Sequence, residues 1–144
     1  MEKVQLKLIY SHNWIDHPLQ IITKIDDRVV NFDCTGQQEV SIDKKIKLSN
    51  SDHLVSVHIS NKNESNTKID ENHNVIADSL VTIKSLQFDE IEVLPLINQG
   101  NIQSFYVDNQ KDQVLSKITE LGLNGTWEFK FKTPVYDWLL ESLF

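Results

Sequence analysis

The 144-residue chain has few cysteines, glycines and prolines, with one, four and three of them respectively. A single cysteine, Cys34, excludes an intrachain disulfide and a thiolate metal cluster, and it suits a reducing compartment best. The scarce glycines form no phosphate-cradling loop and no glycine-flanked serine elbow. No apolar run reaches the length of a signal peptide core or a membrane span, so we expect neither segment.

The chain is also poor in positive charge. It carries 14 lysines and arginines against 21 aspartates and glutamates, which gives a net charge of −7. A nucleic-acid groove needs a basic patch to neutralise phosphates, and binding to an anionic membrane surface needs one as well. We therefore expect no nucleic acid and no membrane among the partners.

Patterns typical of catalysis are missing as well. The five histidines are scattered along the chain, and none forms a short-spaced metal pair. Asp89 and Glu90 are adjacent in a segment that reads as extended, so their side chains point to opposite faces. A paired-carboxylate site would need partners from elsewhere in the chain. The sequence therefore predicts a protein that is not an enzyme.

Alternating apolar and polar residues dominate the chain. Val4, Leu6 and Leu8 alternate with polar residues, and two further runs flank the acidic pair Asp26-Asp27 as a hairpin would. A shift of the apolar register near Ser85 indicates a β-bulge or a sharp bend. Strands at this spacing predict one mostly β domain over residues 1–144, an antiparallel β-sandwich or jelly roll. The main predicted strands are 19–25, 28–34, 53–60, 79–88, 102–107 and 125–132.

Two places near the C-terminus read as short helices. Residues Val114, Leu115, Ile118 and Leu121 have the spacing of one helix face, and Gly122 follows as a C-terminal stop. The second helix is predicted over 135–143, with Pro134 at its first turn. We expect one or both of them to form.

A long polar connection separates the two strongest strands. It offers oxygen ligands of the kind that calcium prefers, although their spacing does not match an EF-hand loop. A solvated loop is the alternative interpretation. We expect no cofactor other than calcium, for which the candidate ligands are Asn63, Glu64, Asp70, Glu71 and Asp78.

Trp14 lies in a turn-like stretch, residues 10–18, between two predicted strands. An aromatic side chain there can stack on the apolar face of a sugar ring, while His12 or Asp16 bonds the hydroxyl groups. The alternative is a tryptophan that covers the end of the core. Trp14, Asp16 and His12 are therefore the candidate carbohydrate-binding residues.

The end of the chain is rich in aromatic and aliphatic side chains. Trp127, Phe129 and Phe131 alternate with charged residues, as expected for the inward face of a core strand. The residues after Pro134 pack either on the chain's own sheet or on a neighbouring subunit, because a large exposed apolar patch is unusual on a monomer. The candidate partner-binding residues are Tyr136, Trp138, Leu139, Leu140, Leu143 and Phe144.

Two resemblances bear on function. Residues 61–63 and 78–93 resemble the later strands of jelly-roll carbohydrate-binding modules, whose calcium-dependent members hold a metal that contacts sugar hydroxyls. The whole chain is similar to small virion-associated proteins of tailed bacteriophages, through its closing pattern over 125–131 and 134–141 and its bias toward Asn, Lys, Ile and Asp. That second resemblance implies a location in the virion or the host cytoplasm.

These observations lead to two hypotheses. The first is a non-enzymatic structural module, a head, neck or tail accessory protein that contacts a protein partner, either itself or other virion proteins. The alternative is a calcium-dependent carbohydrate-binding module whose partner is a glycan.

Overall fold

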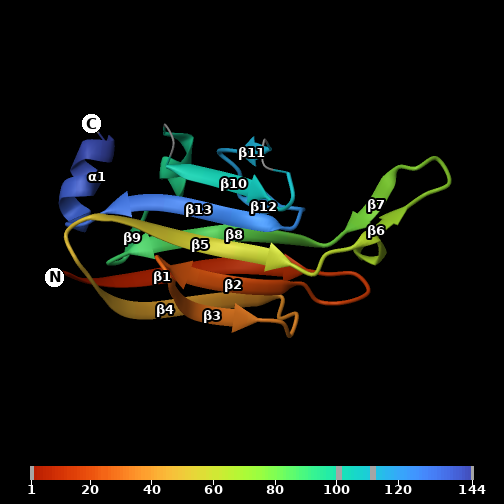
Figure 1. Ribbon diagram of the computed structural model, residues 1–144, viewed down its shortest axis with the longest axis horizontal. Coiled ribbons are helices and arrows are strands. Elements are labelled where there is room, and N and C mark those ends of the chain that lie inside the picture. The colour runs from red at the N-terminus through yellow and green to blue at the C-terminus, as the bar shows by residue number, and fades with distance from the viewer. Residues whose placement is uncertain (1, 100–101, 111–112, 144) are drawn as a thin grey trace.

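The structure is a computed structural model that describes residues 2–99, 102–110 and 113–143 (Figure 1). One antiparallel sheet has the strand order β12-β8-β1-β4, with β9 paired to β8. We call it sheet A. Its strands are β1 (Glu2–Asn13), β4 (Glu39–Leu48), β8 (Leu80–Phe88), β9 (Ile91–Glu92) and β12 (Glu120–Leu121).

The second sheet, sheet B, packs on the first and has the order β11-β10-β13-β5-β2-β3. Its strands are β2 (Gln20–Ile25), β3 (Arg28–Asp33), β5 (Asp52–Ser60), β10 (Gln103–Val107), β11 (Val114–Leu115) and β13 (Gly125–Lys132). The remaining elements are the hairpin strands β6 (Thr67–Ile69) and β7 (Val75–Asp78), the 3-10 turns η1 (Glu64–Asn66) and η2 (Leu94–Asn98), and the helix α1 (Val135–Leu143). The predicted antiparallel β-sandwich is confirmed.

Alternating side chains fill the space between the sheets. Leu6 and Leu8 of β1 face Val55 and Val57 of β5 in one continuous core, and all four are at most 1% exposed. The aromatic side chains of β13 belong to the same core, as the alternation predicted. The buried aromatic residues of this core are Tyr10, Phe88, Phe105, Trp127, Phe129, Phe131 and Trp138.

The predicted bulge lies where β8 pairs with β1. Ile9 pairs with Ser85 while Tyr10 pairs with Ile83, so Lys84 is the extra residue on β8. The apolar register of β8 shifts at this residue because a bulge moves the following side chains to the other face. The prediction is confirmed.

The helix predicted over 114–121 is wrong. Val114 pairs with Tyr106 in β11, and Leu121 pairs with Val81 in β12. Between them Lys117 has a left-handed φ of 59°, which a right-handed helix does not contain. Strand pairing on two different sheets therefore overrides the helical spacing of these apolar residues.

The second predicted helix forms as α1. The Val135 N–H donates to the Glu2 carboxylate at 3.1 Å, so the first strand caps the start of this helix. Along the described part of the chain, no helix combines the length and the apolar character needed to cross a membrane. Figure 1 shows α1 at one end of the long axis and the β6–β7 hairpin at the other.

Candidate functional site

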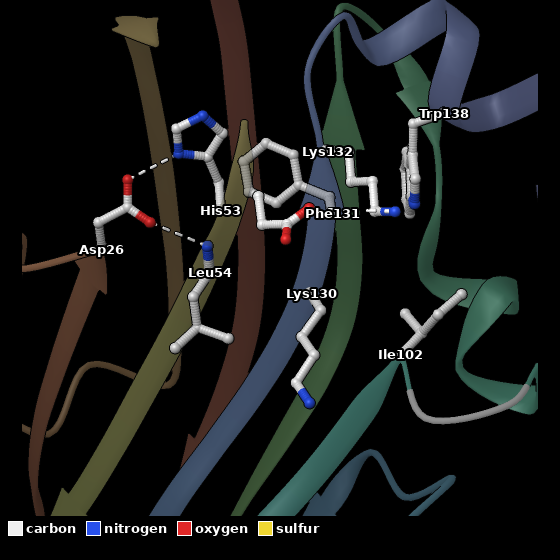
Figure 2. Close-up of a pocket in the computed structure, with 9 residues that line it drawn as sticks. Asp26, His53, Leu54, Ile102, Lys130, Phe131, Lys132 and Trp138 are labelled. Carbon is white, nitrogen blue, oxygen red and sulfur yellow. Dashed lines mark hydrogen bonds and ion pairs between the residues drawn. The ribbon is translucent and has the colours of Figure 1, made fainter. Parts of the chain in front are cut away.

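A pocket with a volume of about 540 Å³ lies at the end of the sandwich that carries α1. We call it the α1-end pocket, and Figure 2 shows the residues around it. It is lined by Asp26, Asp52, His53, Leu54, Ile102, Lys130, Phe131, Lys132 and Trp138. These residues come from the β2–β3 turn, from β5, from β13, from α1 and from the segment before β10.

Strand pairing places four of the lining residues. Lys130 pairs with Leu54, and Phe131 pairs with His53 in the adjacent register position. Because side chains alternate along a strand, Leu54 and Lys130 project from the outer face of sheet B while His53 and Phe131 turn toward the core. The pocket therefore lies where the outer face of two central strands meets the open end of the core.

Trp138 forms one wall of the pocket. Its ring centroid lies 6.2 Å from those of Phe88 and Phe129 and 6.3 Å from that of Phe131, in edge-on arrangements that aromatic pairs prefer. The residue is only 6% exposed, and Figure 2 shows its indole beside the Lys132 side chain. The core therefore fixes the orientation of this wall.

The opposite wall is an Asp26–His53 pair. The Asp26 Oδ2 atom lies 2.8 Å from His53 Nδ1, and Oδ1 accepts the Leu54 N–H at 3.0 Å. The Nε2–H of His53 donates to the Ser49 carbonyl at 2.7 Å. Both groups are thus engaged in contacts that join the β2–β3 turn and the β4–β5 turn to β5.

The lysines of the pocket are less engaged. The Lys132 Nζ atom lies 4.0 Å from Asp52 Oδ1, and both side chains are largely exposed. For Lys130, no carboxylate lies within 4.0 Å among the described residues. Burial raises the pKa of the nearby Glu128 carboxyl, and the positive charge of Lys130 partly offsets that rise. The two ammonium groups are therefore available to a ligand.

The other end of the sandwich carries Trp14, which is 43% exposed. Its Nε1–H donates to the Gly36 carbonyl at 3.1 Å. The indole packs so closely on Gly36 that a Cβ there would lie 2.4 Å from Nε1, and Gly36 has a left-handed φ of 74°. Trp14 is therefore an exposed aromatic side chain held in a fixed position.

Asp16 lies in the same loop as Trp14. Its Oδ2 accepts the Ser65 hydroxyl at 2.8 Å and lies 2.9 Å from His17 Nδ1, while His17 Nε2–H donates to the Asn61 carbonyl at 2.7 Å. These hydrogen bonds lower the pKa of Asp16 and raise the pKa of His17. The loop is thus tied to the segment that follows β5.

His12 does not join Trp14 and Asp16 at the surface. It is 1% exposed, and its side chain faces the core. Neither ring nitrogen has a hydrogen-bond partner among the described residues, and the same holds for buried atoms of Tyr10, Thr23 and Asp33. Burial lowers the pKa of His12 and raises that of Tyr10, in each case with Asp33 as the next influence. The structure therefore separates His12 from the predicted sugar-binding loop.

The predicted calcium ligands are spread along the β6–β7 hairpin and its base. Asp70 accepts the backbone N–H groups of Asn72 and Asn74 in the hairpin turn, at 2.8 and 2.9 Å, and Glu71 belongs to the same turn. Asn63 accepts the Ser65 N–H at the base, where it caps η1. These residues act as turn and cap groups.

Asp78, at the base of the hairpin, pairs with a lysine. Its Oδ1 lies 2.7 Å from the Lys62 Nζ atom, which also donates to the carbonyls of Ser79 and Gly122. Within the described ranges, no three His, Cys, Asp or Glu side chains are placed to hold a metal. Of the five predicted ligands, Asn63, Glu64, Asp70, Glu71 and Asp78, the four carboxylates therefore do not gather into a cluster of three or more.

The predicted partner surface divides along α1. Trp138 and Leu139 are each 6% exposed and belong to the core, so the structure corrects their assignment to a partner surface. Tyr136 and Leu140 are 56% and 58% exposed. The Leu143 side chain and Phe144 lie outside the described residues.

Sequence reasoning missed most of the α1-end pocket. Asp26 was interpreted only as a turn residue, and Lys130 and Lys132 only as the polar face of a strand. The alternation over 125–132 does show that the two lysines share a face. Nothing local shows that Asp26 approaches β5 or that Trp138 closes the pocket.

No known protein-family profile matches the chain, and no curated protein matches it. A solved structure of a carbohydrate-binding module, described as vCBM60 in complex with galactobiose, is similar to it. The TM-score is 0.53, and the match covers 87% of this chain and 96% of that one. The two chains share a fold. At 8% sequence identity the likeness shows no more than that. These comparisons give no support to a virion role.

Proposed function

We propose that this chain is a non-catalytic glycan-binding module that holds a sugar in the α1-end pocket. The observation that carries the proposal is the lining of this cavity of about 540 Å³, which joins aromatic and aliphatic surface to charged hydrogen-bonding groups. Sugars present the same combination, because their rings have apolar C–H faces and hydroxyl edges. A carbohydrate-binding module of similar fold, solved with galactobiose, supports this assignment.

The pocket residues have distinct roles in this proposal. Leu54 and Ile102 contact the apolar face of the sugar, and Trp138 bounds the pocket beside them. Lys130 and Lys132 donate to its oxygen atoms, since an ammonium group offers three donors. The Asp26–His53 pair acts through position, because its hydrogen bonds hold the neighbouring turns against β5.

A pocket-blocking variant tests the proposal. In Leu54→Arg a long side chain occupies the pocket floor, whereas the Leu54 N–H that Asp26 accepts stays in place. Leu123→Arg is the matched control, because Leu123 is 44% exposed and does not line the pocket. On a glycan array we expect signal from the wild type and from Leu123→Arg, and no signal from Leu54→Arg.

The array also tests the residues predicted from sequence. Trp14→Ala is included, and loss of signal in that variant with full signal in Leu54→Arg would move the site to the loop end. Calcium is titrated in parallel by thermal shift. A wild type that binds no glycan, with or without calcium, would contradict the proposed function.

Contact with a protein partner is the second candidate function. It is favoured by Tyr136 and Leu140, which are exposed and lie four residues apart on one face of α1. If this face mediates self-association, light scattering will give a mass above the monomer that falls in Leu140→Glu. A monomeric mass for the wild type would remove self-association.

A further inference from the structure

The charges of the α1-end pocket differ in how far the fold already uses them. Asp26 bonds His53 and the Leu54 N–H, so its carboxylate is engaged. The Asp52 side chain is 86% exposed, and its Oδ1 atom lies 4.0 Å from the Lys132 Nζ atom. Lys130 has no carboxylate within 4.0 Å in the described part of the chain, and Lys132 has the Asp52 carboxylate at 4.0 Å. Among the lining charges that the structure describes, the one left without an opposite partner, Lys130, is therefore positive.

The positive charge of these lysines is opposite in sign to the net charge of the whole chain, which is −7. Both ammonium groups belong to β13, two residues apart, so the alternation of the strand directs them to the same face. Figure 2 shows the Lys132 chain running beside the indole of Trp138 and the Lys130 chain beside Leu54. A ligand in this pocket thus meets apolar surface and positive charge together.

We infer that the ligand of the α1-end pocket is an acidic sugar, one that carries a carboxylate on its ring, as a uronate does. The inference rests on the proposed glycan-binding function and specifies the substrate class of that site. The carboxylate pairs with the Lys130 ammonium group in a charge-assisted contact, and Lys132 adds positive charge on the same face of β13. The ring lies on Leu54 and Ile102, so a small inorganic anion lacks the apolar contacts that the pocket offers.

Calorimetric titrations with digalacturonate and galactobiose test this specificity. Lys130→Gln and Lys132→Gln remove one charge each from the pocket. Lys45→Gln removes the same charge from an exposed position of β4, on the other sheet, and serves as the control. Acetate and phosphate serve as competitors that carry the charge without the ring.

We expect digalacturonate to bind more tightly than galactobiose, and salt to weaken only the acidic ligand. Each pocket variant weakens digalacturonate binding by about 2- to 5-fold, the range for a solvent-exposed ion pair, and weakens galactobiose binding less, because the Gln amide still donates to a hydroxyl group but carries no charge. Lys45→Gln has no effect on either ligand.

The alternative outcomes separate the two proposals. Equal affinity for both disaccharides, with no effect of the lysine variants, overturns the acidic specificity and leaves glycan binding intact. Competition by acetate or phosphate as strong as by the sugar also overturns it, because the site then recognises charge alone. Binding of neither disaccharide, together with a silent glycan array, removes the proposed function and this inference with it.

Discussion

The two ends of the sandwich use their polar side chains in different ways. At the loop end, the side chains of Asp16, Lys62 and Asn66 form hydrogen bonds or ion pairs with neighbouring loops. At the α1 end, the Asp26–His53 pair does the same, but Lys130 and Lys132 beside it stay available. The proposed site therefore differs from the loop end in that the fold leaves some of its polar contacts unmade.

The largest effect is expected from Trp138→Ala. The indole packs against Phe88, Phe129 and Phe131, so its loss leaves a cavity and lowers the free energy of unfolding by about 3–5 kcal/mol. Leu140→Ala is the control on the same helix and changes it by less than about 0.5 kcal/mol, because Leu140 is exposed. Urea denaturation measures both, and similar values would show that α1 does not close the core.

Asn66→Ala removes three buried hydrogen bonds at the loop end. Asn66 is 0% exposed, donates to the carbonyls of Ile15 and His17 and accepts the Asn63 N–H. Removing it leaves buried groups unpaired and lowers the free energy of unfolding by about 2–3 kcal/mol. Ligand affinity at the α1 end stays unchanged. If affinity falls in the folded variant, the two ends are coupled.

Trp14→Ala has a smaller effect on stability. The side chain is partly exposed and makes one hydrogen bond to Gly36, so a loss of about 1 kcal/mol is expected in urea denaturation. A loss above roughly 3 kcal/mol would instead identify Trp14 as a core residue.

The smallest expected effect is the pH dependence of local stability at the loop end. The contacts of His17 with Asp16 and Asn61 raise its pKa above the unfolded value of about 6.5. Their contribution is complete below pH 6.5 and is lost as the pH rises through the folded pKa. Amide hydrogen exchange of residues 14–17, corrected for its intrinsic pH dependence, should therefore speed up over that window. His17→Gln should abolish this change, and a pH-independent wild type would refute the assignment.

Much of the fold could be predicted from sequence because its signals are local. Alternation identified β1, β5, β8 and β13, and the register shift near Ser85 placed the bulge that lies at Lys84. The prediction of a helix over 114–121 was wrong because the same apolar residues, Val114 and Leu121, are also suited to strand pairing with distant partners. Spacing alone does not decide between these outcomes.

The site was harder to predict because its parts meet only in three dimensions. Asp26 and His53 are 27 residues apart, and Trp138 reaches the pocket on a helix that follows β13. Asn63 and Asp78 were predicted as metal ligands because of their residue types. Composition does not show that the Asn63 side chain caps η1 or that the Asp78 carboxylate pairs with Lys62. The exposed Trp14 and Asp16 were placed in one loop correctly, and His12 was not, because inward alternation continues to the end of β1.

Lys62 gives the loop end a built-in counter-ion. Its ammonium group bonds the Asp78 carboxylate and the carbonyls of Ser79 and Gly122, which join three segments of the chain. Because this cation is covalently attached, it is present at a fixed ratio of one per molecule and does not exchange with the medium. The junction therefore balances the Asp78 charge without a bound divalent ion, and salt screens this pair only weakly because the Lys62 side chain is 10% exposed.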